Sequence, residues 1–178
     1  NLVFTSWFFR HKNTYERFFV DNRLRNLRVA FTIALLYGSV MNYTSFSGDE
    51  FKAFREIKDL RPLNTLNLVK VHKEVQYPDG EVVSGVEAYK RYGRLSFPIF
   101  ANLGGKIIWR GEMLFPLIGP SEEKWDFCFI AEYPSAGAFV SMVKDPDYRE
   151  AVKHRQIAVK DSRLIRMAPL SVGENFSE

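Results

Sequence analysis

Two pairs of residues have side chains and spacings suited to binding a small molecule. Tyr89 and Tyr92 are three residues apart, so on a helix both phenol hydroxyls can face one pocket. Tyr148 and Arg155 are seven residues apart and therefore also share a helical face. Phenols donate and accept hydrogen bonds, and a guanidinium binds a carboxylate. The pairs predict a pocket for a small aromatic or carbonyl-bearing molecule, although paired tyrosines are also typical of the polar edge of a core.

Arg155 requires a partner if its helix packs against the rest of the protein, because a buried guanidinium is costly without one. Two partners fit the pattern. One is a structural ion pair with Asp126 or Glu132 on a neighbouring strand, and the other is the carboxylate of a ligand. The exposed row of the same helix holds Lys153 and Lys160. The inner row is expected to consist of Tyr148, Val152, Arg155 and Val159.

Three further residues extend the candidate site. His154 can titrate near neutral pH, but it points about 100° away from Arg155 and also suits a solvated or structural position. Asn67 interrupts an apolar strand, so it must hydrogen-bond either to the backbone or to a bound molecule. Trp109 is expected to line the core or a dimer interface. The candidate pocket residues are Asn67, Tyr89, Tyr92, Trp109, Asp126, Tyr148, His154 and Arg155.

The sequence contains no motif for a metal or a cofactor. His72 and His154 are the only histidines after residue 40, and no third ligand stands near either of them. The stretch "NLGGK" has neither P-loop nor dinucleotide-binding spacing. Cys128 is the single cysteine, which excludes an internal disulfide, and its apolar strand predicts a buried, unreactive thiol. We expect no metal, no cofactor and a reducing, cytoplasmic location.

The net charge of +4 lies wholly in the first forty residues. These hold six Lys/Arg and two Asp/Glu, whereas the remaining residues hold nineteen of each sign. The body of the protein therefore lacks the positive surface that a phosphate backbone requires, and no nucleic-acid partner is expected.

An apolar run at residues 29–41 follows three arginines. It is too short to span a bilayer, which needs about 20 residues. Three interpretations remain open: a structural extension or anchor that contacts a membrane or a partner, the core of a signal peptide, or sequence upstream of a native start at Met41.

The pattern of elements after this segment predicts an α+β fold. Ser47, Ser84, Ser135 and Asp145 each precede a helical pattern as N-caps, and Pro98 is expected to kink or shorten its helix. Helices are predicted at 47–60, 84–104, 135–144 and 145–160, and strands at 64–75, 106–119, 125–134 and 162–169.

The order from the first strand onward is β-α-β-β-α-β, the split βαβ or ferredoxin-like arrangement with an antiparallel sheet. We predict an N-terminal extension (1–46), a ferredoxin-like domain (47–170) and a C-terminal tail (171–178). The strand at 125–134 is apolar on both sides, so the sheet face without helices must be covered. A second copy of the chain would cover it, which predicts a homodimer with its sheets packed face to face.

A series of motifs resembles one known family. In chain order they are "LNLVKVH", "SGVEAYKRYG", "GGKIIWRG", "WDFCFIAEYPS", "MVKDPDY", "HR" and "DSRLI". Together they resemble domain-of-unknown-function family 1330, of the dimeric α/β-barrel superfamily, over about residues 50–169. The resemblance implies a homodimeric barrel of two ferredoxin-like sheets, with a small pocket between sheet and helices. The family's activity is undefined, and its superfamily includes cofactor-free monooxygenases, lactone isomerases and haem enzymes.

Two functional hypotheses follow. In the first, the protein binds a small molecule, and as a cofactor-free enzyme it would act on a small aromatic or carbonyl metabolite. This predicts a closed cavity of about 300 Å³ or more, with at least two candidate side chains pointing inward. In the second, the protein is a non-catalytic homodimeric interaction module, in which Arg155 pairs with a carboxylate of the protein.

Overall fold

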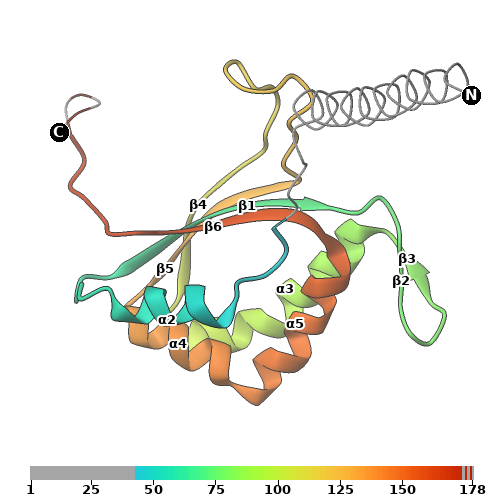
Figure 1. Cartoon of the computed structure of the whole chain (residues 1–178), viewed down its shortest axis with the longest axis horizontal. Coiled ribbons are helices and arrows are strands. Elements are labelled where there is room, and N and C mark those ends of the chain that lie inside the picture. The colour runs from blue at the N-terminus through green and yellow to red at the C-terminus, as the bar shows by residue number, and fades with distance from the viewer. Residues whose placement is uncertain (1–42, 174, 176, 178) are drawn as a thin grey trace, which may run out of the picture. The chain divides into compact units, whose positions relative to one another are not determined.

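A four-stranded antiparallel sheet with helices against one face forms the centre of the structure, a computed structural model (Figure 1). The structure describes residues 43–173, 175 and 177. The apolar run at 29–41 lies outside the described residues, so its three interpretations stay predictions. Among the described helices, none has the length and apolar character needed to cross a membrane.

The strands of the sheet lie in the order β4-β5-β1-β6, and all neighbours are antiparallel. A separate two-stranded hairpin, β2–β3, precedes α3, the longest of the described helices. The strands are β1 (Leu63–Val71), β2 (Val75–Gln76), β3 (Val82–Val83), β4 (Lys106–Gly111), β5 (Phe127–Tyr133) and β6 (Val159–Met167). The helices are α2 (Gly48–Glu56), α3 (Gly85–Asn102), α4 (Ala136–Lys144) and α5 (Pro146–Ala158).

This order of elements confirms the predicted ferredoxin-like α+β fold. β1 lies inside the sheet and pairs with β5 on one side and β6 on the other. The register places Asn67 opposite Phe129 and Leu164. The four helices α2 to α5 of the described part of the chain lie on the same side of the sheet (Figure 1). The described helices therefore cover one face of the sheet and leave the other face uncovered.

Each helix begins at an N-cap that the sequence predicts. The hydroxyls of Ser47, Ser84 and Ser135 each accept a hydrogen bond from the backbone N–H three residues later. Asp145 ends α4 and caps α5, whose first residue is Pro146. The break at Asp145 therefore lets two consecutive helices follow one another without a loop.

The chain between β4 and β5 differs from the prediction. The strand predicted at 106–119 ends at Gly111, and residues 112–126 form no strand. Pro116 and Pro120 lack the N–H that a strand ladder needs. The segment instead projects beyond the sheet on the side away from the helices (Figure 1).

Helix α3 continues through Pro98 to Asn102, so the proline does not end the helix where it stands. Proline removes the hydrogen bond to the carbonyl four residues earlier, that of Arg94. Both residues are exposed, so water can bind this carbonyl.

Two clusters of buried residues form the core between the sheet and the helices. Phe129 of β5 packs against both of them, at the middle of the sheet. One cluster holds Val69, Val71, Val75, Ala88, Tyr89, Ala158 and Val159. The other holds Leu63, Phe100, Ala131, Tyr133, Phe139 and Met142.

Candidate functional site

A cavity of about 620 Å³ lies between the sheet and the helices and is bordered by both core clusters. Aromatic side chains from α2, α3, α4 and β5 form much of its wall, and Thr65 and Asn67 of β1 line its sheet side. The volume exceeds the predicted minimum. Ser45 and Phe46 line the cavity and are exposed, so the cavity opens to solvent. The prediction of a closed cavity is therefore wrong.

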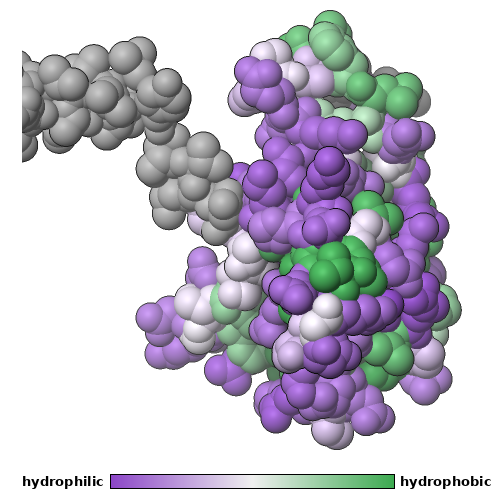
Figure 2. Space-filling view, turned by 90° about the vertical axis from the view of Figure 1, so that its right-hand side faces the viewer, coloured by the Kyte–Doolittle hydropathy of each residue, from purple (hydrophilic) through white to green (hydrophobic). Residues whose placement is uncertain are grey.

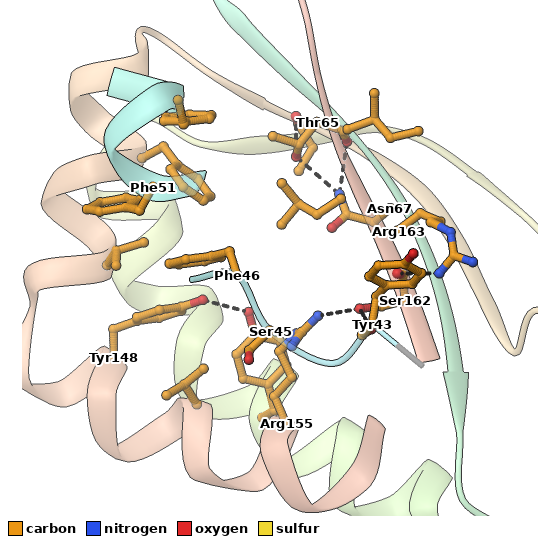
Figure 3. A pocket seen from close by; sticks show the side chains of 18 of the residues that line it. Tyr43, Ser45, Phe46, Phe51, Thr65, Asn67, Tyr148, Arg155, Ser162 and Arg163 are labelled. Atoms are coloured by element: carbon orange, nitrogen blue, oxygen red, sulfur yellow. Dashed lines mark hydrogen bonds between the residues drawn. The ribbon is translucent and has the colours of Figure 1, made fainter. Parts of the chain in front are cut away.

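Helix α5 presents three residues of its predicted inner row to this cavity, whereas the fourth, Val159, is buried at the start of β6 and does not line the cavity. Tyr148, Val152 and Arg155 all line it. Lys153 is exposed, as the helical spacing predicts, whereas Lys160 is exposed but belongs to β6 and not to the helix. Figure 3 shows Tyr148 and Arg155 on the same helix, both directed into the cavity.

One wall of the cavity is formed by residues 43–57, which we call the strap; it consists of an extended segment followed by α2. The N–H of Tyr43 donates to Asp161 Oδ1 at 2.8 Å, and Ser162 Oγ donates to the Tyr43 carbonyl at 2.8 Å. The guanidinium of Arg155 donates to the Thr44 carbonyl. Figure 3 shows Tyr43, Ser162 and Arg155 meeting on this side of the cavity. The described end of the predicted extension, residues 43–46, is therefore bound to the ferredoxin-like body.

The helical part of the strap is held by aromatic packing. The rings of Phe51 and Phe54 pack against the second core cluster, and the Phe54 and Phe139 centroids lie 4.9 Å apart. At the other end of α2, Arg166 of β6 donates a hydrogen bond to the Phe54 carbonyl. This contact satisfies one of the carbonyls that a helix leaves free at its C-terminus. The strap is thus bound by apolar contacts at α2 and by hydrogen bonds at its extended segment.

The hydroxyls of Tyr92 and Tyr148 form a hydrogen-bonded pair within the cavity, with their oxygens 3.1 Å apart. Burial raises the pKa of Tyr148 well above its usual value, and the neighbouring Tyr92 raises it further. Burial also raises the pKa of Tyr89 and Tyr133. Tyr89, Tyr133 and Tyr148 are therefore neutral at pH 7. Only one proton of the pair is used between the two oxygens, so the other can be donated to a ligand.

Asn67 was predicted to hydrogen-bond either to the backbone or to a bound molecule, and the structure shows a bond to the backbone. Its Nδ2 donates to the Thr65 carbonyl at 2.9 Å and to Thr65 Oγ1 at 3.1 Å. Within residues 43–173, no group donates to its Oδ1. That oxygen is available to accept a hydrogen bond from a molecule in the cavity.

The predicted ion pair of Arg155 with Asp126 or Glu132 is wrong. Asp126 accepts a hydrogen bond from the Val71 N–H at 2.8 Å, and Glu132 pairs with Lys106 at 2.9 Å. Arg155 instead donates to two neutral oxygens, the Thr44 carbonyl and Ser162 Oγ. In the described part of the chain, no carboxylate pairs with Arg155. The sequence pattern suggested carboxylates on the neighbouring strand as partners, but the guanidinium binds the Thr44 carbonyl of the strap instead.

Three of the eight candidate residues lie elsewhere. Trp109 is half exposed and pairs in register with Ile130. Both side chains therefore lie on the sheet face that the described helices leave uncovered. Asp126 binds the end of β1 through the Val71 N–H. His154 Nδ1 lies 2.7 Å from the hydroxyl of Tyr77, beside the β2–β3 hairpin. The cavity therefore brings together Asn67, Tyr89, Tyr92, Tyr148 and Arg155, and not the other three.

The sequence reasoning missed the strap and its anchors. Phe46, Phe51 and Phe54 line the cavity, as does Ser162 of β6. The amphipathic pattern of α2 predicted a helix with one buried face, but it did not show that this face packs against the cavity. Ser162 lies in a strand rich in charged residues, so its sequence context gave no signal that it anchors the strap.

Asp161 and Arg163 hold the start of the strap next to this site. Arg163 pairs with Asp161 at 2.7 Å and stacks on the ring of Tyr43, 4.7 Å from its centroid. Burial opposes the ionisation of Asp161, but hydrogen bonds from the Tyr43 N–H and from Arg163 outweigh it, so the pKa of Asp161 is lowered. The carboxylate stays charged at neutral pH and keeps its hold on the strap.

The cavity can bind and orient a polar ligand with the groups just described: a phenol pair, an amide oxygen and a guanidinium. The part of its lining that the structure describes includes no histidine and no cysteine. No cluster of three His, Cys, Asp or Glu residues that could hold a metal ion occurs among the described residues. The arrangement is suited to hydrogen bonding and to charge recognition.

The architecture is that of a ferredoxin-like α+β protein with a cavity between sheet and helices. Residues 82–167 match the model of the family described as "Domain of unknown function (DUF1330)". A protein of unknown function from Rhodopseudomonas palustris, RPA0582, is 50% identical, and its structure covers 74% of this chain and 100% of its own with a TM-score of 0.71. The methylated form of the same protein matches with a TM-score of 0.72 over 75% of this chain and 98% of its own. The chain belongs to the DUF1330 family.

More distant solved structures share little beyond the general outline. A dimeric protein of unknown function with a ferredoxin-like fold from Bacteroides fragilis is 12% identical over 60% of this chain and 95% of its own, with a TM-score of 0.41. SnoaB, a cofactor-independent oxygenase from Streptomyces nogalater, is 12% identical over 65% of this chain and 99% of its own, with a TM-score of 0.40. Among curated proteins, the chain has no match. Similarities this weak say nothing about the activity of this protein.

Proposed function

We propose that this protein binds a small organic molecule in the cavity between its sheet and its helices. The observation that carries the proposal is the cavity itself: about 620 Å³ of space within the core of a domain. Protein interiors are normally packed to the density of organic crystals, so a solvent-open cavity of this size between sheet and helices does not result from ordinary core packing. It also falls in the range of about 300–1,000 Å³ that is usual for ligand sites.

The wall chemistry supports binding of an aromatic or carbonyl-bearing metabolite. The aromatic rings offer flat apolar surfaces, and the Tyr92–Tyr148 pair can donate a hydrogen bond to a carbonyl oxygen. The geometry favours binding over catalysis, because His154, the candidate acid or base, contacts Tyr77 and does not line the cavity. A cofactor-free reaction on such a metabolite would use the tyrosine pair to polarise the carbonyl.

The test is a screen of small aromatic fragments by nuclear magnetic resonance, with binding located from the backbone amides that shift. Fragments should shift amides of the cavity wall. Val152→Phe places a ring in the cavity and should abolish these shifts, whereas Lys153→Phe adds the same ring on the exposed face of the same helix and should not. Fragment binding that is unaffected by Val152→Phe would place the site elsewhere and refute the proposal.

A second proposal concerns the sheet face without helices: we infer that two copies of the chain pack against each other there. The face carries Leu66 and Leu68 of β1, Ile130 of β5 and Ile165 of β6, and Ile165 is 46% exposed. Its charged residues are largely compensated within one chain, as in the Lys106–Glu132 pair. Two identical faces that are each close to neutral can meet without strong repulsion.

The segment between β4 and β5 continues this apolar surface. Four of its large apolar side chains are 74–96% exposed. They are Leu114, Phe115, Leu117 and Ile118. Apolar residues clustered in this way on a surface typically mark an interaction site. Figure 2 shows hydrophobic side chains gathered at the top of the molecule, where this segment lies in Figure 1. Such a surface is expected to be buried in a dimer.

Sedimentation velocity tests the dimer. The protein should sediment as a dimer at micromolar concentration, and Ile165→Glu should convert it to a monomer. Leu95→Glu is the matched control, because Leu95 has a similar exposure, 51% against 46% for Ile165, but lies on α3, on the other side of the sheet. A monomeric wild type, or a dimer that survives Ile165→Glu and Trp109→Glu, would refute this proposal.

A further inference from the structure

The strongest unexplained feature of the cavity is the positive charge of Arg155. This half-buried guanidinium lines the cavity, and both of its described partners are neutral oxygens. A guanidinium has five N–H donors, and two of the Arg155 donors are used by Thr44 and Ser162. Removing such a charge from water without an anion is unfavourable. The remaining donors are therefore available for an anion inside the cavity.

The other charges around the cavity are already paired or lie outside its interior. Glu50 is the one carboxylate among the described lining residues, and it accepts the Ser47 N–H at 2.6 Å in the capping box of α2. The hydrogen bonds with Ser47 also lower the pKa of Glu50, which keeps it ionised in that role. Arg163 is paired with Asp161, and Arg149 is exposed at the edge. Arg155 is thus the inward-facing charge that a ligand can neutralise.

We propose that the ligand of this cavity is a small organic acid, with its carboxylate on Arg155 and a flat apolar body against the aromatic wall. The inference rests on the proposed binding function and specifies the class of ligand. A carboxylate forms two parallel hydrogen bonds with a guanidinium, which matches the free donors of Arg155. The phenol pair of Tyr92 and Tyr148 and the amide oxygen of Asn67 supply a donor and an acceptor for a further polar group on the ligand.

The strap is part of this recognition. Arg155 donates to the Thr44 carbonyl, and the aromatic rings of Phe46 and Phe51 stack on each other with their centroids 5.3 Å apart beside the cavity. A carboxylate held by Arg155 lies next to this segment and shares the guanidinium with it. Binding of the acid is therefore expected to alter the protection of the strap amides.

The experiment compares an acid with its neutral amide of the same shape. Naphthoate and naphthamide are titrated into the isotope-labelled full chain, and dissociation constants are obtained from the shifts of cavity amides. Naphthoate is expected to bind wild type at least about tenfold more tightly than naphthamide, with the preference falling to within about twofold in Arg155→Gln. Lys153→Gln removes the same charge from the exposed face of the same helix and should keep the full preference.

Arg155→Lys guards against a variant that misfolds, because it keeps the charge and should retain most of the preference. Equal affinity of the two compounds for wild type, or a preference that persists in Arg155→Gln, would overturn the assignment of a carboxylate to Arg155 and leave the cavity as a binding site. If neither compound shifts cavity amides, the inference is overturned for aromatic acids, and the fragment screen decides the binding function independently.

Discussion

The guanidinium of Arg155 donates a hydrogen bond to the carbonyl oxygen of Thr44, 111 residues earlier in the chain. This contact joins helix α5 to the strap across the opening of the cavity. The same side chain also binds Ser162 of β6, whose hydroxyl in turn holds the Tyr43 carbonyl. One arginine thus connects a helix, a strand and the segment that forms the cavity wall.

Arg155→Gln is therefore expected to loosen the strap. Loss of a hydrogen bond from a charged donor should lower the free energy of unfolding by about 1–3 kcal/mol. Hydrogen exchange followed by mass spectrometry should show faster exchange of the amides in residues 43–57. Lys153→Gln, on the exposed face of α5, should change neither quantity. Unchanged strap exchange in Arg155→Gln would show that the aromatic contacts of α2 alone hold the segment.

Asp161 should make the attachment of the strap dependent on pH. Its pKa is lowered in the folded protein, so its charge stabilises the fold above the ordinary carboxyl pKa of 3.8, and this contribution is lost as the pH falls through the lower folded value. Asp161→Asn keeps an oxygen that can accept the Tyr43 N–H and removes only the charge. The difference in unfolding free energy between wild type and variant, measured by urea denaturation, should be constant near neutral pH and shrink below about pH 4. A difference that does not change on acidification would contradict the assigned role.

The phenol pair should behave as a coupled unit. In a double-mutant cycle of Tyr92→Phe and Tyr148→Phe, the coupling energy in the free energy of unfolding is expected to be about 0.5–1.5 kcal/mol, the usual value of a hydrogen bond between neutral groups. Tyr77→Phe breaks a hydrogen bond to His154 outside the cavity, so its effect should add to that of Tyr148→Phe. A coupling near zero would mean that each hydroxyl finds an equivalent partner in water.

Two glycines of α3 should respond to alanine in opposite directions. A Cβ on Gly85 would lie 2.0 Å from the His72 carbonyl oxygen, which is backbone and cannot rotate away, so Gly85→Ala should destabilise the protein by more than about 1 kcal/mol. A Cβ on Gly93 has no atom within 4 Å, so Gly93→Ala should stabilise the helix by about 0.5–1 kcal/mol. Thermal unfolding of both variants decides this. Similar shifts of the midpoint in the same direction would contradict the close packing at Gly85.

The sequence predicted the fold better than the site because the two depend on contacts of different range. The caps at Ser47, Ser84, Ser135 and Asp145 and the alternation of β1 are local, and each was predicted correctly. The inner row of α5 followed from helical spacing alone. The orientation of Arg155 was therefore predictable, but its partner was not, because Thr44 is distant in sequence and contributes a backbone oxygen that no residue pattern identifies.

The candidates that fall outside the cavity failed for a similar reason. Trp109 is an aromatic residue at a bulge between β4 and β5, where the register shifts between Ile107 and Trp109. Simple alternation does not show on which face a side chain lies beyond such a shift. The ring of His154 could form hydrogen bonds with many partners. The β2–β3 hairpin places the Tyr77 hydroxyl beside it, and sequence spacing does not show this contact.

The interior position of β1 has a consequence for the order of events during synthesis. β1 is made before both of its neighbours in the sheet, β5 and β6. Until β6 leaves the ribosome, the nascent polypeptide carries an apolar strand with no permanent partner on that side. Folding of this domain must therefore wait until β6 has been made, and a chain that terminates prematurely before Val159 would expose β1 to chaperones and proteases.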